Sequence, residues 1–348
     1  MILDTLSLRD LGWSPYFQAG LDAVEQTDSD PVRVAAVHRN GVDVLGPDGA
    51  RRVTTGVALP TEAIAVGDWL LVERASGRAL RILERKSLLG RRAAGTGHDA
   101  QLIAANLDTL FIVTSCNAEF NAARLERYLA VARQAGVTPV IVLTKVDACD
   151  DPDSYADRAR ALSAALPVEA VNALDQASVA RLAGWCGGGQ TVALTGSSGV
   201  GKSTLTNALT GAALLTNGIR EDDAHGRHTT TARTLHRTLG GGWLIDTPGM
   251  RALRLADVAD GIGAVFDDIA DLAEGCRFGD CGHDGEPGCA VRAAIEAGAL
   301  DAGRLARWRK LAREDARNSA SLAESRARDR AWGRFHKSVK REIRHRKR

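Results

Sequence analysis

The stretch that decides the fold covers residues 195–204 and reads Thr-Gly-Ser-Ser-Gly-Val-Gly-Lys-Ser-Thr. An apolar run at residues 192–194 precedes it, and a helix-prone segment at residues 205–215 follows it. The spacing G-x-x-x-x-G-K-S between a strand and a helix is typical of a phosphate-binding loop, because backbone N–H groups and the helix N-terminus converge on an anion. We predict that nucleotide phosphates contact Gly196, Ser197, Ser198, Gly199, Val200, Gly201, Lys202, Ser203 and Thr204. In this prediction Lys202 reaches the β- and γ-phosphates and the Ser203 hydroxyl binds Mg²⁺.

The length of 348 residues predicts two or three domains, because single cores rarely organise so long a chain. No apolar run approaches the roughly 20 residues that a membrane-spanning helix needs, so we expect no membrane partner. The first ten residues lack the hydrophobic segment of a secretion signal, and we expect a cytoplasmic protein. A monomer is expected because no coiled-coil seam is visible.

The formal net charge of +2 is unevenly distributed. Residues 326–348 contain eleven Lys or Arg against Asp329 and Glu342, which gives this tail +9 and leaves −7 for the rest. A basic tail on a slightly acidic body indicates a polyanionic partner, most simply RNA. The alternative is a solvated tail without a partner.

The region of residues 31–95 shows short strand-like runs at 32–37, 42–45, 51–59, 69–72 and 80–83, separated by turn residues such as Asn40-Gly41. Five short strands in about sixty residues are typical of a small barrel of the OB type. Trp69 is the only aromatic residue between Val32 and Leu89, which disfavours base stacking as a mode of RNA binding. A Gly- and Arg-rich segment at residues 90–97 predicts a linker and a domain boundary near residue 95.

An α/β pattern follows, with strands expected at residues 110–113 and 139–143 and helices at 122–135 and 154–166. The second strand leads into Thr144, Lys145, Val146 and Asp147, which resemble the N-K-x-D element of GTPases with Thr144 at the Asn position. A carboxylate at Asp147 would accept hydrogen bonds from N1–H and the N2 amino group of guanine, and adenine offers neither donor. Thr is shorter than Asn, which leaves open whether Thr144 bridges to the phosphate loop.

Asn172 and Ala173 follow a further candidate strand at residues 168–171. They resemble the S-A element of GTPases, whose backbone supports the guanine carbonyl.

Two further segments fit roles around the γ-phosphate. Asp246, at the end of a strand, fits the Mg²⁺-holding aspartate, and the Gly249 N–H can contact the γ-phosphate. Either Thr230 or Thr231 is expected to complete the Mg²⁺ shell. Met250 stands where Ras-type enzymes carry the water-orienting Gln, so His228 is the candidate for that role, and a surface histidine is the alternative.

A compact Cys/His group follows, with Cys276, Cys281, His283 and Cys289 among four glycines. Three thiolates and one imidazole complete a tetrahedral Zn²⁺ shell without an open position, which predicts one structural zinc ion. The alternative is a set of reduced cysteines beside an unrelated histidine.

The guanine element precedes the phosphate loop by about fifty residues, so the GTPase domain reads as circularly permuted. This order, together with the cysteine group, resembles the RsgA (YjeQ) family of small ribosomal subunit biogenesis GTPases. The expected fold is α/β and multidomain, with an OB-type barrel, a circularly permuted P-loop GTPase domain and a C-terminal zinc-binding and helical module. We expect limits of 1–30 for an N-terminal arm, 31–95 for the barrel, 96–252 for the GTPase domain, and 253–348 for the zinc module with its basic tail.

The resemblance implies hydrolysis of GTP to GDP and phosphate, with the small ribosomal subunit and its rRNA as nucleotide-controlled partners in late maturation. Two alternatives remain: an RNA-binding module with a weakly hydrolytic regulatory nucleotide site, and a GTP-dependent metal-delivery protein.

Overall fold

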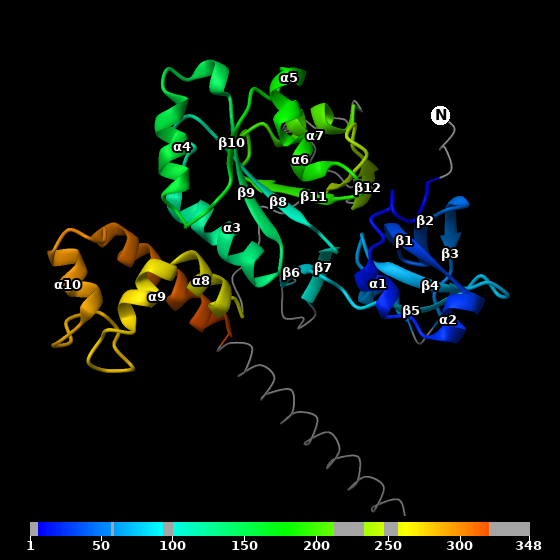
Figure 1. The fold of residues 1–348 in the computed structure, drawn as a ribbon, viewed down its shortest axis with the longest axis horizontal. Coiled ribbons are helices and arrows are strands. Elements are labelled where there is room, and N and C mark those ends of the chain that lie inside the picture. Colours follow the sequence, from blue (N-terminus) through cyan, green and yellow to red (C-terminus); the bar gives the residue numbers. More distant parts are fainter. Residues whose placement is uncertain (1–5, 57–58, 93–99, 212–232, 247–256, 320–348) are drawn as a thin grey trace, which may run out of the picture.

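The computed structural model describes residues 6–56, 59–92, 100–211, 233–246 and 257–319 (Figure 1). The predictions for His228, Thr230, Thr231, Gly249 and the basic tail lie outside these residues. Within the described part, no helix is both long and apolar enough to cross a bilayer.

The first part is a five-stranded antiparallel barrel in the order β3-β2-β1-β4-β5. Its strands are β1 (Ser29–His38), β2 (Gly41–Gly46), β3 (Gly49–Val53), β4 (Trp69–Glu73) and β5 (Ala79–Ile82). The strands surround a small apolar core of Val32, Val34, Val42, Val44, Val53, Ile64, Leu70 and Val72. All five predicted strands are present, although the third ends at Val53 rather than at residue 59. A short 3-10 turn, η1 (Thr61–Ala63), lies between β3 and β4.

The N-terminal segment packs against the barrel through α1 (Pro15–Ala19) and α2 (Ala23–Asp28). Trp13 meets the Trp69 ring edge-on at 4.8 Å between centroids, and Trp69 is 1% exposed, so it offers no surface for base stacking. Arg33 of β1 is buried and donates hydrogen bonds to the Leu11 carbonyl and the Thr191 hydroxyl, while burial lowers its pKa to about 10. The N-terminal segment therefore fills the junction between the barrel and the next domain.

The second part is a mainly parallel sheet in the order β10-β9-β8-β11-β13-β12. Its strands are β8 (Thr109–Ser115), β9 (Thr138–Thr144), β10 (Val168–Ala170), β11 (Thr191–Gly196), β13 (Trp243–Asp246) and the antiparallel β12 (Thr234–Arg237). The barrel joins this sheet where β1 pairs with β12 at Ala36 and Thr234.

Helices cover both faces of this sheet. Alternate residues of each strand point to opposite sides, and because both sets are apolar, both faces need to be covered. On one face Leu110 and Ile112 pack with α3 (Ala122–Gln134) and α4 (Pro152–Arg160). On the other face Phe111 and Val113 pack with α7 (Lys202–Thr210). The remaining elements here are α5 (Gln176–Val179), α6 (Ala183–Cys186), η2 (Val146–Ala148) and η3 (Ala180–Leu182).

A hairpin of β6 (Leu88–Arg92) and β7 (Ala100–Ala105) lies between the barrel and β8. The prediction that residues 90–97 form a linker is therefore wrong for residues 90–92, which pair with β7. Local composition alone indicated a linker here. It could not show that residues 90–92 pair with β7, because β7 lies later in the chain.

The C-terminal part consists of α8 (Ala259–Val265), α9 (Asp267–Ala273), a cysteine-containing loop, α10 (Ala290–Glu296) and a helix at residues 302–319. It packs against α3, as Figure 1 shows. Buried Glu126 of α3 contacts Arg307 at 2.9 Å and Arg304 at 3.5 Å, and Arg127 pairs with Glu314 at 2.6 Å. These ion pairs tie the C-terminal part to the second domain.

Two predicted helices are shorter than the sequence pattern suggested. The helix after the phosphate loop ends at Thr210, where Gly211 adopts a left-handed φ of 67°. The helix predicted at residues 154–166 ends at Arg160. In the C-terminal part, Gly298, with a φ of 75°, separates α10 from the helix at residues 302–319. Left-handed backbone at glycine is a common way to end a helix.

Candidate functional site

The predicted nucleotide-binding segments meet at the carboxyl edge of the parallel sheet. The register pairs Ser115 with Thr144 and Gly196 with Val113, so β8, β9 and β11 end at the same edge. Asp246 ends β13, which is parallel to β11. Open α/β sheets bind ligands at this edge.

The phosphate loop has the backbone that its glycines predict. Gly196 has a φ of 142°, and a Cβ on it would lie 2.1 Å from the Val113 carbonyl oxygen. Gly201 caps α7 with a φ of 90°, so the first helical residue is Lys202. Ser198, Gly199 and Ser203 are exposed, Ser197, Lys202 and Thr204 are half-buried, and Val200 is buried. The Lys202 ammonium donates to the Ser197 carbonyl across the loop.

The Thr144 side chain bridges the two loops. Its hydroxyl is fully buried and lies 2.6 Å from the Val200 carbonyl oxygen and 3.2 Å from that of Thr114. The question that the sequence left open is therefore answered: threonine makes the bridge.

Lys145, Val146 and Asp147 form the exposed end of this strand. Lys145 has a left-handed φ of 58°, unusual for a residue with a Cβ, and such backbone concentrates at ligand sites. The side chains of Lys145 and Asp147 are exposed, and Val146 is half-buried.

Asn172 and Ala173 follow β10 in a turn fixed by side chains. The Asn172 N–H donates to the Ser178 hydroxyl, and the Asn172 Oδ1 accepts from the Leu174 N–H, both at 2.9 Å. Ala173 is buried, while Leu174 is 81% exposed. The segment thus lies beside β9, as the register between Ala170 and Leu143 requires.

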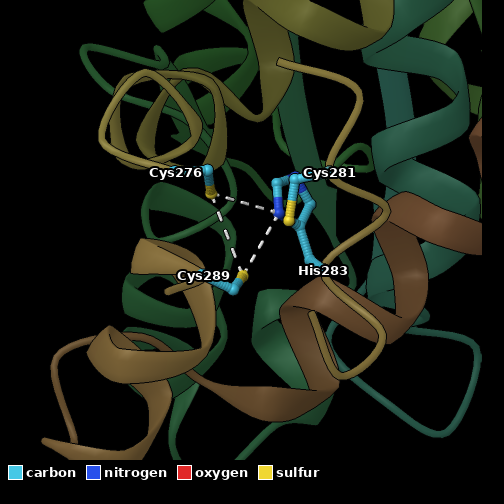
Figure 2. A group of neighbouring side chains, drawn as sticks. All are labelled: Cys276, Cys281, His283 and Cys289. Atoms are coloured by element: carbon cyan, nitrogen blue, oxygen red, sulfur yellow. Dashed lines mark hydrogen bonds between the residues drawn. The ribbon is translucent and has the colours of Figure 1, made fainter. Parts of the chain in front are cut away.

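The four predicted metal ligands converge, as Figure 2 shows. The ligand atoms of Cys276, Cys281, His283 and Cys289 all lie within 4.8 Å of one another. The Cys276 and Cys289 sulfurs are 3.9 Å apart, and they lie 3.6 and 3.5 Å from the His283 Nδ1. A tetrahedral Zn²⁺ site has edges of about 3.8 Å between sulfurs and about 3.6 Å between sulfur and nitrogen. The cluster therefore has the size to hold a metal ion.

The electrostatic environment differs between the ligands: it favours a thiolate at Cys276 and a neutral imidazole at His283, whereas burial raises the pKa of Cys281 to about 11. Burial would raise the pKa of Cys276, but the backbone N–H groups of Val291 and Ala290 at the start of α10 reverse this and leave that pKa lowered. Burial lowers the pKa of His283 and so favours neutral imidazole, the form that binds metals. Trp308 packs on the His283 ring at 5.5 Å between centroids.

Glu286 is a supporting residue that the sequence analysis missed. Its carboxylate accepts hydrogen bonds from the N–H groups of Gly282, Asp284 and Gly285 at 2.7–3.0 Å, which holds the loop that carries His283. Backbone N–H groups, including its own, lower its pKa to about 2. The available signal was an acidic residue in a glycine-rich turn, between Gly285 and Pro287. A second missed residue, Arg124, contacts the phosphate loop from α3.

Comparison with known proteins shows which family the chain resembles. The RsgA GTPase family pattern matches residues 82–256. A Mesorhizobium japonicum protein named small ribosomal subunit biogenesis GTPase RsgA is 54% identical over 319 residues, covering 90% of this chain and 91% of its own. The Vibrio parahaemolyticus protein of the same name, numbered RsgA 2, is 48% identical over 333 residues, covering 95% and 92%.

Two solved structures share the fold. YjeQ from Thermotoga maritima has a TM-score of 0.59 and 24% identity, covering 81% of this chain and 97% of its own. YloQ, described as a circularly permuted GTPase, has a TM-score of 0.59 and 22% identity, covering 88% and 99%. The family pattern over residues 82–256 and the relatives at 54% and 48% identity lead to one conclusion: the chain belongs to the RsgA GTPase family.

Proposed function

We propose that this protein is a GTPase that acts in late maturation of the small ribosomal subunit, hydrolysing GTP to GDP and phosphate while the bound nucleotide controls its binding to rRNA. The observation that carries this proposal is the Thr144–Val200 hydrogen bond, because it sets the guanine element directly against the phosphate loop. The names of the relatives supply the ribosomal target.

The roles of the site residues follow from their chemistry. Asp147 accepts from guanine, the Lys145 stem covers the base, and the backbone at Asn172 and Ala173 supports the guanine carbonyl. The loop of residues 196–204 holds the phosphates through its N–H groups and Lys202. Outside the described residues, His228 orients the attacking water, either Thr230 or Thr231 completes the Mg²⁺ shell, and the Gly249 N–H contacts the γ-phosphate.

Mg²⁺ is the expected companion of GTP, and it would neutralise charge on the phosphate oxygens. Ser203 at the start of α7 and Asp246 at the end of β13 would hold it. A hydroxyl and a carboxylate are hard oxygen donors, which fits this ion.

Zn²⁺ is the ion we propose for the Cys276, Cys281, His283 and Cys289 cluster. Three sulfurs and one nitrogen within 4.8 Å of one another suit zinc, and four protein ligands leave no position for a substrate. The ion then has a structural role and stabilises a loop with little apolar core of its own.

The proposed domains are an N-terminal arm at residues 1–30, the barrel at 31–95, the GTPase domain at 96–252 and the zinc module with its basic tail at 253–348. We propose that the basic tail contacts rRNA. We place the protein in the cytoplasm as a monomer.

The guanine site is tested by exchanging the carboxylate. Asp147→Asn replaces one acceptor by an amide donor that faces the N1–H and N2 donors of guanine. We expect GTP affinity to fall at least about 100-fold while affinity for xanthosine triphosphate rises, since mispaired buried polar groups are strongly disfavoured. Asp150→Asn, an exposed neighbour, is the matched control and should leave affinity unchanged. Equal binding of ATP and GTP by the unchanged protein would refute the proposal.

The ribosomal role is tested by co-sedimentation with small ribosomal subunits in GDP and in a non-hydrolysable GTP analogue. Sedimentation that depends on the analogue supports a nucleotide-controlled factor. Equal sedimentation in both nucleotides favours an RNA-binding module with a regulatory nucleotide site.

A further inference from the structure

Arg124 reaches the phosphate loop from the first turn of α3. The Asn121 side chain caps this helix and accepts from the Arg124 N–H at 3.0 Å, so the backbone of Arg124 is fixed. Its guanidinium donates from Nη1 to the Ser197 hydroxyl, across 73 positions of sequence. The contact exists because α3 follows β8, which is the parallel neighbour of β11.

Ser197 is the point where two cationic side chains meet. Its hydroxyl accepts from Arg124, and its carbonyl accepts from the Lys202 ammonium. Glu119 approaches Arg124 only at 3.5 Å and is half exposed, so it neutralises the guanidinium weakly. Positive charge therefore accumulates beside a loop whose backbone already favours anions.

The two contacts differ in what bound nucleotide does to them. If Lys202 turns to the β- and γ-phosphates, as the loop sequence predicts, the Ser197 carbonyl loses that partner. Arg124 approaches from α3, outside the loop, and its bond to the Ser197 hydroxyl does not compete with the phosphates for the same backbone groups. The Arg124 guanidinium is planar and its helix is capped, so it can hold the Ser197 hydroxyl in a fixed position.

We propose that Arg124 is a positioning residue for nucleotide binding: it holds Ser197, and with it the first turn of the phosphate loop, in the form that accepts the phosphates. The inference rests on the proposed GTPase function and adds a residue outside the sequence motifs. The loop holds the phosphates before and during the reaction, so the effect falls on KM and on nucleotide affinity rather than on kcat.

The test is a double-mutant cycle of Arg124→Ala and Ser197→Ala, read out by fluorescent GDP and GTP binding and by steady-state hydrolysis. Each single change should weaken GTP and GDP binding about five- to tenfold, as expected for a charged hydrogen bond that is partly exposed. The double variant should bind no more than about twofold more weakly than Arg124→Ala, because both changes remove one interaction. kcat should stay within about twofold.

Two further variants separate positioning from charge and from helix stability. Arg124→Lys keeps the charge without the planar fork and should recover only part of the affinity. Arg133→Ala removes the same charge from an exposed position at the far end of α3 and should leave affinity unchanged. The melting temperature of nucleotide-free Arg124→Ala should stay close to that of the unchanged protein.

The inference is overturned if the effects in the cycle are additive or if Arg124→Ala binds nucleotide with unchanged affinity. It is also overturned if the melting temperature of Arg124→Ala falls far enough to account for the weaker binding. A fall in kcat at constant KM would also overturn it. The proposed function fails separately, if the unchanged protein shows no preference for guanine nucleotides or no hydrolysis of GTP.

Discussion

The Thr144 hydroxyl donates a hydrogen bond to the Val200 carbonyl, with 2.6 Å between the two oxygens. The bond joins the predicted guanine element to the predicted phosphate loop, 56 positions later in the chain. A hydroxyl has one proton and two carbonyls lie within reach, so the shorter contact to Val200 takes it and Thr114, at 3.2 Å, accepts less often. The two halves of the candidate nucleotide site are thus fixed relative to each other by one buried side chain.

Thr144→Val should loosen this junction without changing its volume. Valine removes the hydroxyl and leaves the Val200 carbonyl buried without its donor, which costs about 1–3 kcal/mol of stability. We also expect GTP and GDP to bind about three- to tenfold more weakly, because the two loops no longer share a fixed spacing. Chemical denaturation and nucleotide titration measure the two effects.

Thr138→Val is the control for this change, since Thr138 lies at the exposed start of the same strand. If Thr144→Val binds nucleotide with the same affinity as the unchanged protein, the Thr144–Val200 hydrogen bond has no part in binding.

Gly261→Ala should separate α8 from α3. A Cβ at this position would lie 2.1 Å from the Ala130 carbonyl oxygen, so the two helices must move apart. We expect a loss of about 2 kcal/mol or more, measured by urea denaturation.

Gly263→Ala in the same helix is the matched comparison. A Cβ there meets no atom within 4 Å, so alanine should stabilise the helix by about 0.5–1 kcal/mol. Similar destabilisation by both substitutions would contradict the close approach of the two helices.

Removing the metal should unfold the loop between α9 and α10. The loop is held by its four ligands, by the hydrogen bonds of Glu286 and by Arg309, which contacts Asp284 and the Gly282 carbonyl. A chelator removes the first of these, so it should raise amide exchange in residues 276–289 and lower the melting temperature. Metal analysis should find about one zinc ion per chain. Cys281→Ser should lose this ion, whereas Cys149→Ser, away from the cluster, should keep it. Full metal content in Cys281→Ser would exclude it as a ligand.

Glu25→Gln should lower stability at neutral pH but not in acid. Two hydrogen bonds from Arg81, at 2.6 and 2.8 Å, and the Asp22 N–H lower the pKa of Glu25 from 4.5 to about 2. A lowered pKa in the folded state means that the stabilisation is present above about pH 4.5 and is lost as the pH falls toward 2.

The urea midpoints of Glu25→Gln and the unchanged protein should therefore differ at pH 7 and converge as the pH falls from about 4.5 toward 2. Glu62→Gln, an exposed change in the same barrel domain, should show no such convergence. A difference that persists unchanged into acid would show that the Arg81 pair is not its cause.

The local patterns predicted most elements because they act within a few residues. Alternating apolar residues gave the five barrel strands, and the run at residues 192–194 with its glycine-rich turn gave β11 and the start of α7. The metal ligands were predictable for the same reason, since all four lie within fourteen consecutive residues. Helix ends were less accurate, because one left-handed glycine outweighs several helix-forming neighbours.

The sequence by itself determined which residues are candidates for the chemistry: a predicted phosphate loop, a predicted guanine-binding carboxylate, and a cysteine and histidine set of the right number for one ion. Tertiary structure alone decided that Thr144 can replace Asn, that Arg124 meets Ser197, and that residues 90–92 form a strand. These features depend on distances between atoms far apart along the chain, which the sheet register sets. No pattern of neighbouring residues encodes such a distance, because only packing of the whole sheet brings the partners together.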